Sequence, residues 1–123
     1  MAVQSATIAR APTGVYSKDY QVATWNVMAN GDTGAPLGEH DFIDRTIQVS
    51  GTWGAGGAVV WEGSNDGASW FTLSNPNGVA LSLTANGMLQ CNYTPLYSRP
   101  HVPGGDGTTQ LTSVVTMRRF RSE

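Results

Sequence analysis

Closely spaced glycines and prolines are the feature that most constrains the fold of this chain. The sequence holds 15 Gly and 6 Pro, and the segments between them show no sustained apolar period of 3.6 residues. These segments are instead short runs rich in Val, Ile, Thr, Trp and Tyr, which favour strands. Turn signals recur roughly every eight to twelve residues, a spacing typical of an all-β sandwich or barrel.

We therefore predict an all-β fold, an antiparallel jelly roll or β-sandwich of about eight strands. Strands are expected at residues 20–25, 43–51, 70–73, 79–84, 88–93, 96–102 and 110–120, with another after a tight turn at residues 54–57. Residues 1–18 have little pattern and are interpreted as an extended N-terminal arm, so the β-sandwich (jelly-roll) domain spans residues 19–123. A loop at residues 26–41 is long enough to be functional.

Charge is sparse and unevenly placed. Charged residues make up 13% of the chain, about half the share usual in soluble domains, and the formal net charge is −2. Three of the seven Lys and Arg are Arg118, Arg119 and Arg121. We expect no direct contact with nucleic acid, because the rest of the chain is acidic. The basic end is either a solvated tail or a contact with an acidic neighbour, and the sparse charge elsewhere favours assembly.

Cys91 is the only cysteine, so no disulfide forms within the chain, and we expect it to be a small buried apolar residue. The first residues lack the apolar core of a signal peptide, and no run of about twenty apolar residues could span a membrane. We therefore expect a protein made in the cytoplasm that does not contact membranes.

The stretch WEGSNDGASWFTL, residues 61–73, has two interpretations. Ser64, Asn65 and Asp66 could supply oxygen ligands to calcium, with Glu62 and Asp106 as further carboxylates. Alternatively, Asn65 and Asp66 cap a turn through their own backbone, with positive φ at Gly67. Because calcium sites gather more carboxylates than this stretch holds, we interpret it mainly as a hairpin turn.

The sequence shows no catalytic or metal-binding set. His40, in the GEHD segment of residues 38–41, is far from His101, and one cysteine with two distant histidines does not make a zinc site. No G-x-S-x-G turn is present, and Cys91 lies in an expected strand. The glycine-rich segments at residues 54–57 and 104–107 open no helix and are interpreted as hairpin turns. We expect a non-enzymatic protein without metal or cofactor.

The four tryptophans leave a binding function open. Two or three of them are expected in the core, while Trp53, next to a turn, is the best candidate for exposure. Paired with Tyr93 or Tyr97, an exposed Trp53 would suit a carbohydrate-binding module, which is the alternative function from a different class.

Several motifs resemble known families. The hairpin GSNDG at residues 63–67, with Trp70 and Leu73, resembles that of discoidin-like (coagulation factor type C) jelly-roll domains, and Tyr97, Arg99 and Pro100 resemble their later RYVRP-type strand. A second resemblance is to small proteins encoded among phage structural genes, with the recurring text VTGTFGAGG, EGSNDG and GGDGTTSLTV. It is carried by residues 49–57, 62–67 and 104–111.

This resemblance implies a capsid decoration (cement) protein of a tailed, short-tailed, double-stranded DNA phage. Such a protein would sit on the outer capsid surface of the virion, bind the major capsid protein and pair with itself as a dimer or trimer. A head fibre or a tail protein is the alternative virion role. The candidate contacts with the capsid or between copies are Tyr16, Lys18, Trp53, Arg118, Arg119 and Arg121.

Overall fold

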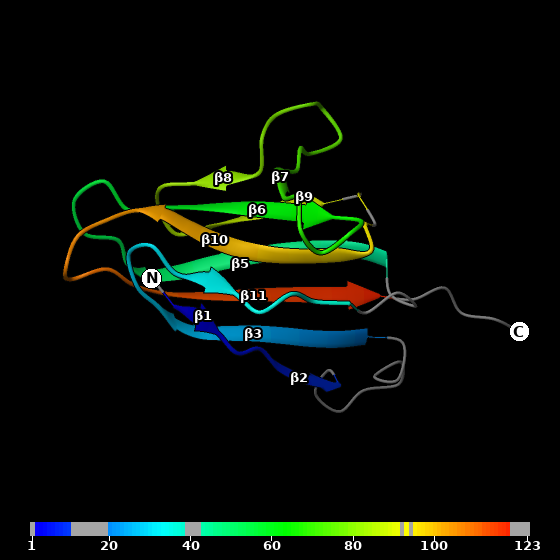
Figure 1. Ribbon diagram of the computed structural model, residues 1–123, viewed down its shortest axis with the longest axis horizontal. Coiled ribbons are helices and arrows are strands. Elements are labelled where there is room, and N and C mark those ends of the chain that lie inside the picture. The colour runs from blue at the N-terminus through cyan, green and yellow to red at the C-terminus, as the bar shows by residue number, and fades with distance from the viewer. Residues whose placement is uncertain (1, 11–19, 39–42, 92, 94, 119–123) are drawn as a thin grey trace, which may run out of the picture.

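Two β-sheets face each other in the computed structural model, which describes residues 2–10, 20–38, 43–91, 93 and 95–118 (Figure 1). The six-stranded sheet has the order β1 (Val3–Gln4), β4 (Thr33–Gly34), β10 (Tyr97–Gly104), β6 (Ala58–Ser64) and β7 (Phe71–Thr72), and β8 (Ser82–Leu83) also pairs with β6. The five-stranded sheet has the order β2 (Thr7–Arg10), β3 (Tyr20–Met28), β11 (Gln110–Arg118), β5 (Ile43–Thr52) and β9 (Gly87–Cys91). These residues include no helix.

The connectivity is that of a jelly roll. From β3 onward the chain crosses repeatedly between the sheets, so that β3, β5, β9 and β11 share one sheet, while β4, β6, β8 and β10 share the other. Neighbours within each sheet are therefore distant in sequence, as in β3-β11-β5-β9 and β4-β10-β6. This arrangement confirms the predicted fold class.

The described strands outnumber the predicted ones because β1, β2 and β4 were not expected. The strands predicted at residues 70–73 and 79–84 are the short β7 and β8, which share one position beside β6. β7 pairs with Glu62 and Gly63 of β6, and β8 pairs with Val59 and Val60. Between them the chain leaves the sheet as a loop that projects from the sandwich (Figure 1). Its base is closed by a hydrogen bond of 2.8 Å from the Leu81 amide to the Leu73 carbonyl. The strand expected at residues 79–84 is thus reduced to β8.

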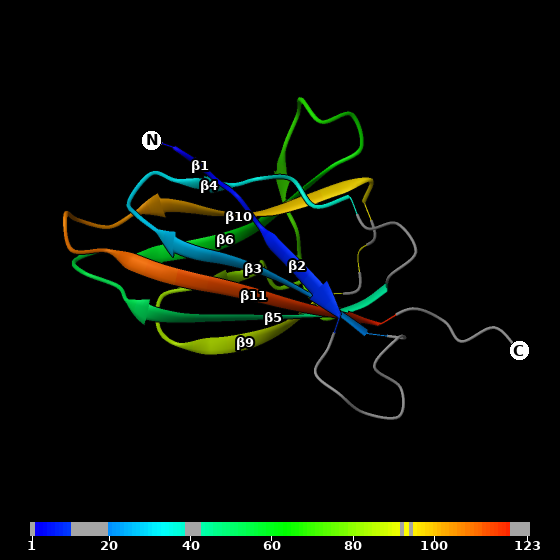
Figure 2. The same ribbon diagram turned by 90° about the horizontal axis from the view of Figure 1, so that it is seen from below.

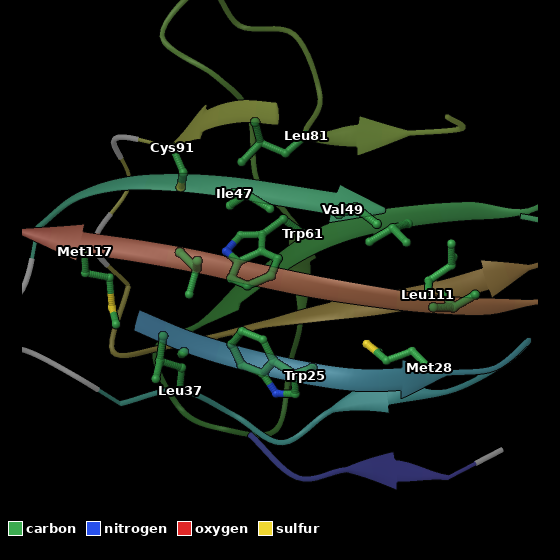
Figure 3. Close-up of a cluster of buried hydrophobic side chains, with 14 residues drawn as sticks. Trp25, Met28, Leu37, Ile47, Val49, Trp61, Leu81, Cys91, Leu111 and Met117 are labelled. Carbon is green, nitrogen blue, oxygen red and sulfur yellow. The ribbon is translucent and has the colours of Figure 1, made fainter. Parts of the chain in front are cut away.

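Alternation along the long strands produces the core. In β11 every second residue from Leu111 to Met117 is buried, and in β6 Val59 and Trp61 face inward. The buried side chains fill the space between the sheets (Figure 3). At the centre the rings of Trp25 and Trp61 meet edge to face, with centroids 5.4 Å apart and an interplanar angle of 78°. Two of the four tryptophans are therefore core residues, as expected.

The N-terminal segment takes part in both sheets. β1 pairs in parallel with β4, and β2 pairs antiparallel with β3, so residues 3–10 pass from one sheet to the other at the same side of the sandwich (Figure 2). This differs from the extended arm expected for residues 1–18, because this part is hydrogen-bonded to the domain. Residues 11–18 lie outside the described residues.

The long loop expected at residues 26–41 is corrected by the structure. β3 continues to Met28, β4 follows at residues 33–34, and Leu37 exchanges hydrogen bonds of 2.7 and 3.1 Å with Ser98. A bulge at the end of β3, where Val27 has φ of 53°, turns the chain toward the other sheet. The sequence hid this pairing because its partner, β10, lies more than sixty residues away. Residues 39–41 lie outside the described residues.

Asp106 joins the two glycine-rich turns at one end of the sandwich. Its carboxylate accepts hydrogen bonds from the Ala55 amide at 2.8 Å, and from the Thr108 hydroxyl at 2.6 Å and amide at 2.8 Å. These bonds, that from Ala55 foremost, lower the pKa of Asp106 to about 2. Asp106 is thus a structural link between the two turns. In the first turn, Gly54 and Gly56 have positive φ.

We expect Asp106→Asn to lower the melting temperature at neutral pH and to have less effect in acid. The folded-state pKa lies below that of an unfolded Asp, about 3.9, so the stabilising contribution is complete above pH 4 and disappears as the pH falls through about 2. Melting temperatures of the two proteins between pH 6 and pH 2 test this. Asn86→Ala removes an uncharged acceptor. Its melting temperature should therefore lie below that of wild type by the same amount at every pH. If the melting temperature of Asp106→Asn lies below that of wild type by the same amount at every pH, the charged Asp106 carboxylate does not stabilise these turns.

Candidate functional site

A rigid turn follows β6. The Oδ1 atom of Asp66 accepts hydrogen bonds from the amides of Ala68 and Ser69, both at 2.8 Å, and from the Ser64 hydroxyl at 2.9 Å. The Ser64 hydroxyl in turn accepts the Gly67 amide at 2.9 Å, and Gly67 has φ of 76°. The bond from the Ser69 amide is the main cause that lowers the pKa of Asp66. The interpretation of residues 63–67 as a capped turn is therefore confirmed.

Asn65 has a different role from the one expected. Its Oδ1 atom accepts the amide of Leu96 at 2.9 Å, which ties the turn to the connection between β9 and β10. The two segments lie close together also at Gly63, where a Cβ would lie 2.7 Å from Pro95 Cγ and 2.9 Å from Leu73 Cδ2. The close packing therefore requires glycine at position 63. The same contact forms one edge of a groove.

An open groove of about 560 Å³ lies between these segments. It is lined by Gly63, Ser64, Asn65, Asp66, Ser69, Phe71, Leu73, Tyr93 and Pro95. Phe71 and Tyr93 are 69% and 50% exposed, although both are large and apolar in most of their area. Sequence reasoning assigned Phe71 only to a strand, because nothing in the local pattern shows that residues 71 and 93 meet.

Trp53 does not join these aromatic residues. Its Nε1 donates a hydrogen bond of 2.8 Å to Asn86 Oδ1, and its ring is half-buried against the core. Trp53 follows the last residue of β5, whereas Cys91, near the groove, pairs with Arg45 at the start of β5. At about 3.3 Å per residue the two ends are roughly 25 Å apart. The pairing of Trp53 with Tyr93 or Tyr97, which the alternative carbohydrate-binding function would need, is therefore not formed.

The motif residues Trp70 and Arg99 meet on the outer face of the six-stranded sheet. The Arg99 guanidinium lies 4.0 Å from the centre of the Trp70 ring, and its Nε is 3.0 Å from Glu62 Oε1. His101 Nδ1 lies 3.2 Å from the other oxygen of Glu62. Arg99 and Glu62 are cross-strand neighbours in register. The motifs that suggested a family are thus joined to one another by structural contacts.

The other candidates divide into two groups. Arg118 is exposed at the end of β11, where it pairs in register with Tyr20 and Ile43. Tyr16, Lys18, Arg119 and Arg121 lie outside the described residues, and so does His40. Cys91 is 1% exposed, and burial raises the pKa of its thiol, as expected for a structural residue. Within the described part of the chain, no three His, Cys, Asp or Glu side chains gather as a metal site would require.

Comparison with known proteins supports the fold. The structure is similar to the crystal structure of the SPBc2 prophage-derived protein YomS. The TM-score is 0.61 at 11% sequence identity, and the match covers 80% of this chain and 93% of YomS. At this identity the similarity shows a shared fold. No family model matches the chain, and no curated protein matches its sequence. A helix that could cross a membrane was not found among the described residues.

Proposed function

We propose that this protein is a non-enzymatic virion component of a tailed phage that binds the outside of the head and stabilises the lattice of the major capsid protein. The observation that carries the proposal is the agreement of two independent signals. The motifs at residues 49–57, 62–67 and 104–111 resemble products of phage structural genes, and the jelly roll is shared with a prophage-derived protein.

One end of the sandwich is the best candidate for the contact. Arg118 marks this end together with Tyr20 and Ile43, because it pairs in register with each of them. Among the expected contacts, Lys18 lies two residues before Tyr20 in the sequence, and Arg119 directly follows Arg118. The opposite end is closed by the Asp106 network, and Trp53 there is half-buried. The proposed contact therefore consists of the basic residues at the first end and does not include Trp53.

In this mechanism the jelly roll acts as a rigid body. The two sheets and their shared core fix the relative position of all the exposed contacts, so weak contacts with neighbouring capsid subunits add as avidity. A dimer or trimer placed on a symmetry axis would multiply them further. The source of stability would be simultaneous contact with several subunits, and no reaction or cofactor is needed.

The basic end provides a test. Neutralising Arg118, Arg119 and Arg121 to Gln should weaken binding to heads that lack the protein, and the loss should be larger at about 50 mM than at about 500 mM salt, because salt screens exposed charges. A variant with Asn77, Thr84 and Gln90 changed to Glu has the same change in net charge at other exposed positions. It should bind nearly as wild type. Equal losses for the two variants, or a loss independent of salt, would count against this contact.

A further inference from the structure

The groove beside the turn has the lining of a ligand site. Phe71 and Tyr93 present large ring surfaces to solvent, and Leu73 and Pro95 add apolar area between the two segments. Its volume of about 560 Å³ lies within the roughly 300–1,000 Å³ of small-molecule sites. Covering exposed aromatic rings removes apolar surface from water, which favours binding, so a ligand with flat apolar faces would gain most.

The polar side of the groove is fixed in place before any ligand arrives. Asp66 uses Oδ1 for the turn, and within the described residues its Oδ2 accepts no hydrogen bond. Asn65 uses Oδ1 for the Leu96 amide, which leaves its NH₂ group to donate. A carboxylate acceptor and an amide donor from adjacent residues are therefore held on a rigid turn, with the Ser69 hydroxyl in the same lining.

This pairing suits a ligand with neighbouring hydroxyl groups. Each hydroxyl both donates and accepts, so one can donate to a carboxylate oxygen while the next accepts from an amide. Among the residues that the structure describes, no Lys, Arg or His lines the groove. An anionic ligand such as a phosphate would therefore meet Asp66 without a compensating cation. A metal ion would find a single carboxylate, fewer than calcium sites provide.

We propose that this groove binds a neutral saccharide, whose C–H face stacks on Phe71 and Tyr93 while its hydroxyl groups bond to Asn65 and Asp66. The site is a second binding function, separate from attachment to the head. The groove is lined by the end of β6, by β7 and by the segment before β10, whereas the proposed basic contact is at the end of β11 in the other sheet. It uses Tyr93 from the predicted aromatic set and replaces Trp53 with Phe71.

A glycan array with neutral oligosaccharides of glucose, galactose, mannose and N-acetylglucosamine, and with sialylated and sulfated chains for comparison, tests the proposal. We expect binding to one or more neutral chains and none that depends on negative charge. Phe71→Ala and Tyr93→Ala should each weaken binding of the best chain by about tenfold or more. Met88→Ala and Val79→Ala, which remove equally exposed side chains outside the groove, should have no effect.

The polar contribution is tested by Asp66→Asn, which keeps an acceptor oxygen for the turn but removes the charge. Binding should weaken. The melting temperature should also fall, because the hydrogen bonds that lower the pKa of Asp66 stabilise the turn when the carboxylate is charged, so binding is measured well below the melting temperature. No binding to any neutral saccharide by the folded protein would overturn the proposal, as would binding unaffected by both aromatic changes. The Phe71→Ala, Tyr93→Ala double variant should still bind heads normally. If it instead loses head binding, the groove contacts the capsid and the saccharide assignment is wrong, while the head-binding function stands.

Discussion

Trp25→Ala should lower the free energy of unfolding by about 3–5 kcal/mol, the range for removing a large aromatic side chain from a core. Trp25 is 0% exposed and packs edge to face on Trp61 at the centre of the sandwich. The change leaves a cavity between the sheets and removes the hydrogen bond of 3.1 Å from Trp25 Nε1 to the Ala35 carbonyl. Because both sheets contribute to this contact, no single loop can relax to fill the space.

Urea unfolding followed by circular dichroism would measure the loss without depending on tryptophan fluorescence. Trp25→Phe is the matched control, since it keeps a ring against Trp61 and loses the hydrogen bond and part of the volume. Its destabilisation should be about half that of alanine or less. A loss below about 1 kcal/mol for Trp25→Ala would contradict the placement of this residue at the centre of the core.

Asp32→Ala should have the second largest effect, a loss of about 2–3 kcal/mol. Asp32 is only 4% exposed, and its carboxylate accepts hydrogen bonds from the Ala2 amide at 3.0 Å, the Gln4 side chain at 2.9 Å and the Ala29 amide at 2.9 Å. Burial acts to raise the pKa of Asp32, but these hydrogen bonds together lower it. The carboxylate therefore stabilises β1 and the turn after β3 when it is charged.

The Asp32 effect has a local readout as well. Amide hydrogen exchange should become faster at Thr33 and Ala35, whose amides donate to the carbonyls of Ala2 and Gln4, before it changes in β11. Asp32→Asn keeps one acceptor oxygen, so its exchange rates at these amides should lie between those of wild type and Asp32→Ala. The difference between wild type and Asp32→Ala should narrow as the pH falls below about 4, because the charged carboxylate is then lost. Uniformly faster exchange across both sheets would show that Asp32 does not anchor β1 specifically.

The sequence predicts much of this fold because the long strands carry their own pattern. Alternation in residues 43–51 and 110–118 survives in β5 and β11, and the capping chemistry of Asp66 and Gly67 acts within a few residues. Such features need no knowledge of distant partners. β1, in contrast, is only two residues long and is defined by its pairing with β4. A segment this short carries no alternation from which a strand could be predicted.

The groove was hidden for a related reason. Phe71 and Tyr93 belong to segments that meet only through the long-range contacts of Asn65 with Leu96 and Gly63 with Pro95. Trp53 is half-buried against the core, and its Nε1 donates to Asn86, which lies thirty-three residues away. Adjacency to a turn indicates exposure only when no other loop folds over that turn.

The family motifs have a physical explanation that also limits their meaning. Trp70 stacks under Arg99, Gly63 makes room for Leu73 and Pro95, and Pro100 is fully buried. These residues hold β6, β7 and β10 together, so a similar set is expected in any jelly roll built around this hairpin. Such motifs identify architecture, and a function must be tested on the exposed surfaces.

Binding to capsids tests the central claim most directly. Purified protein would be co-sedimented with intact phage heads that lack it, and the loaded heads would then be heated while DNA release is followed. The head-binding proposal predicts saturable binding and a higher temperature of DNA release, with both effects reduced by neutralising the basic C-terminal end. Failure to sediment with heads, or binding that leaves the release temperature unchanged, would contradict the role of a head-stabilising protein.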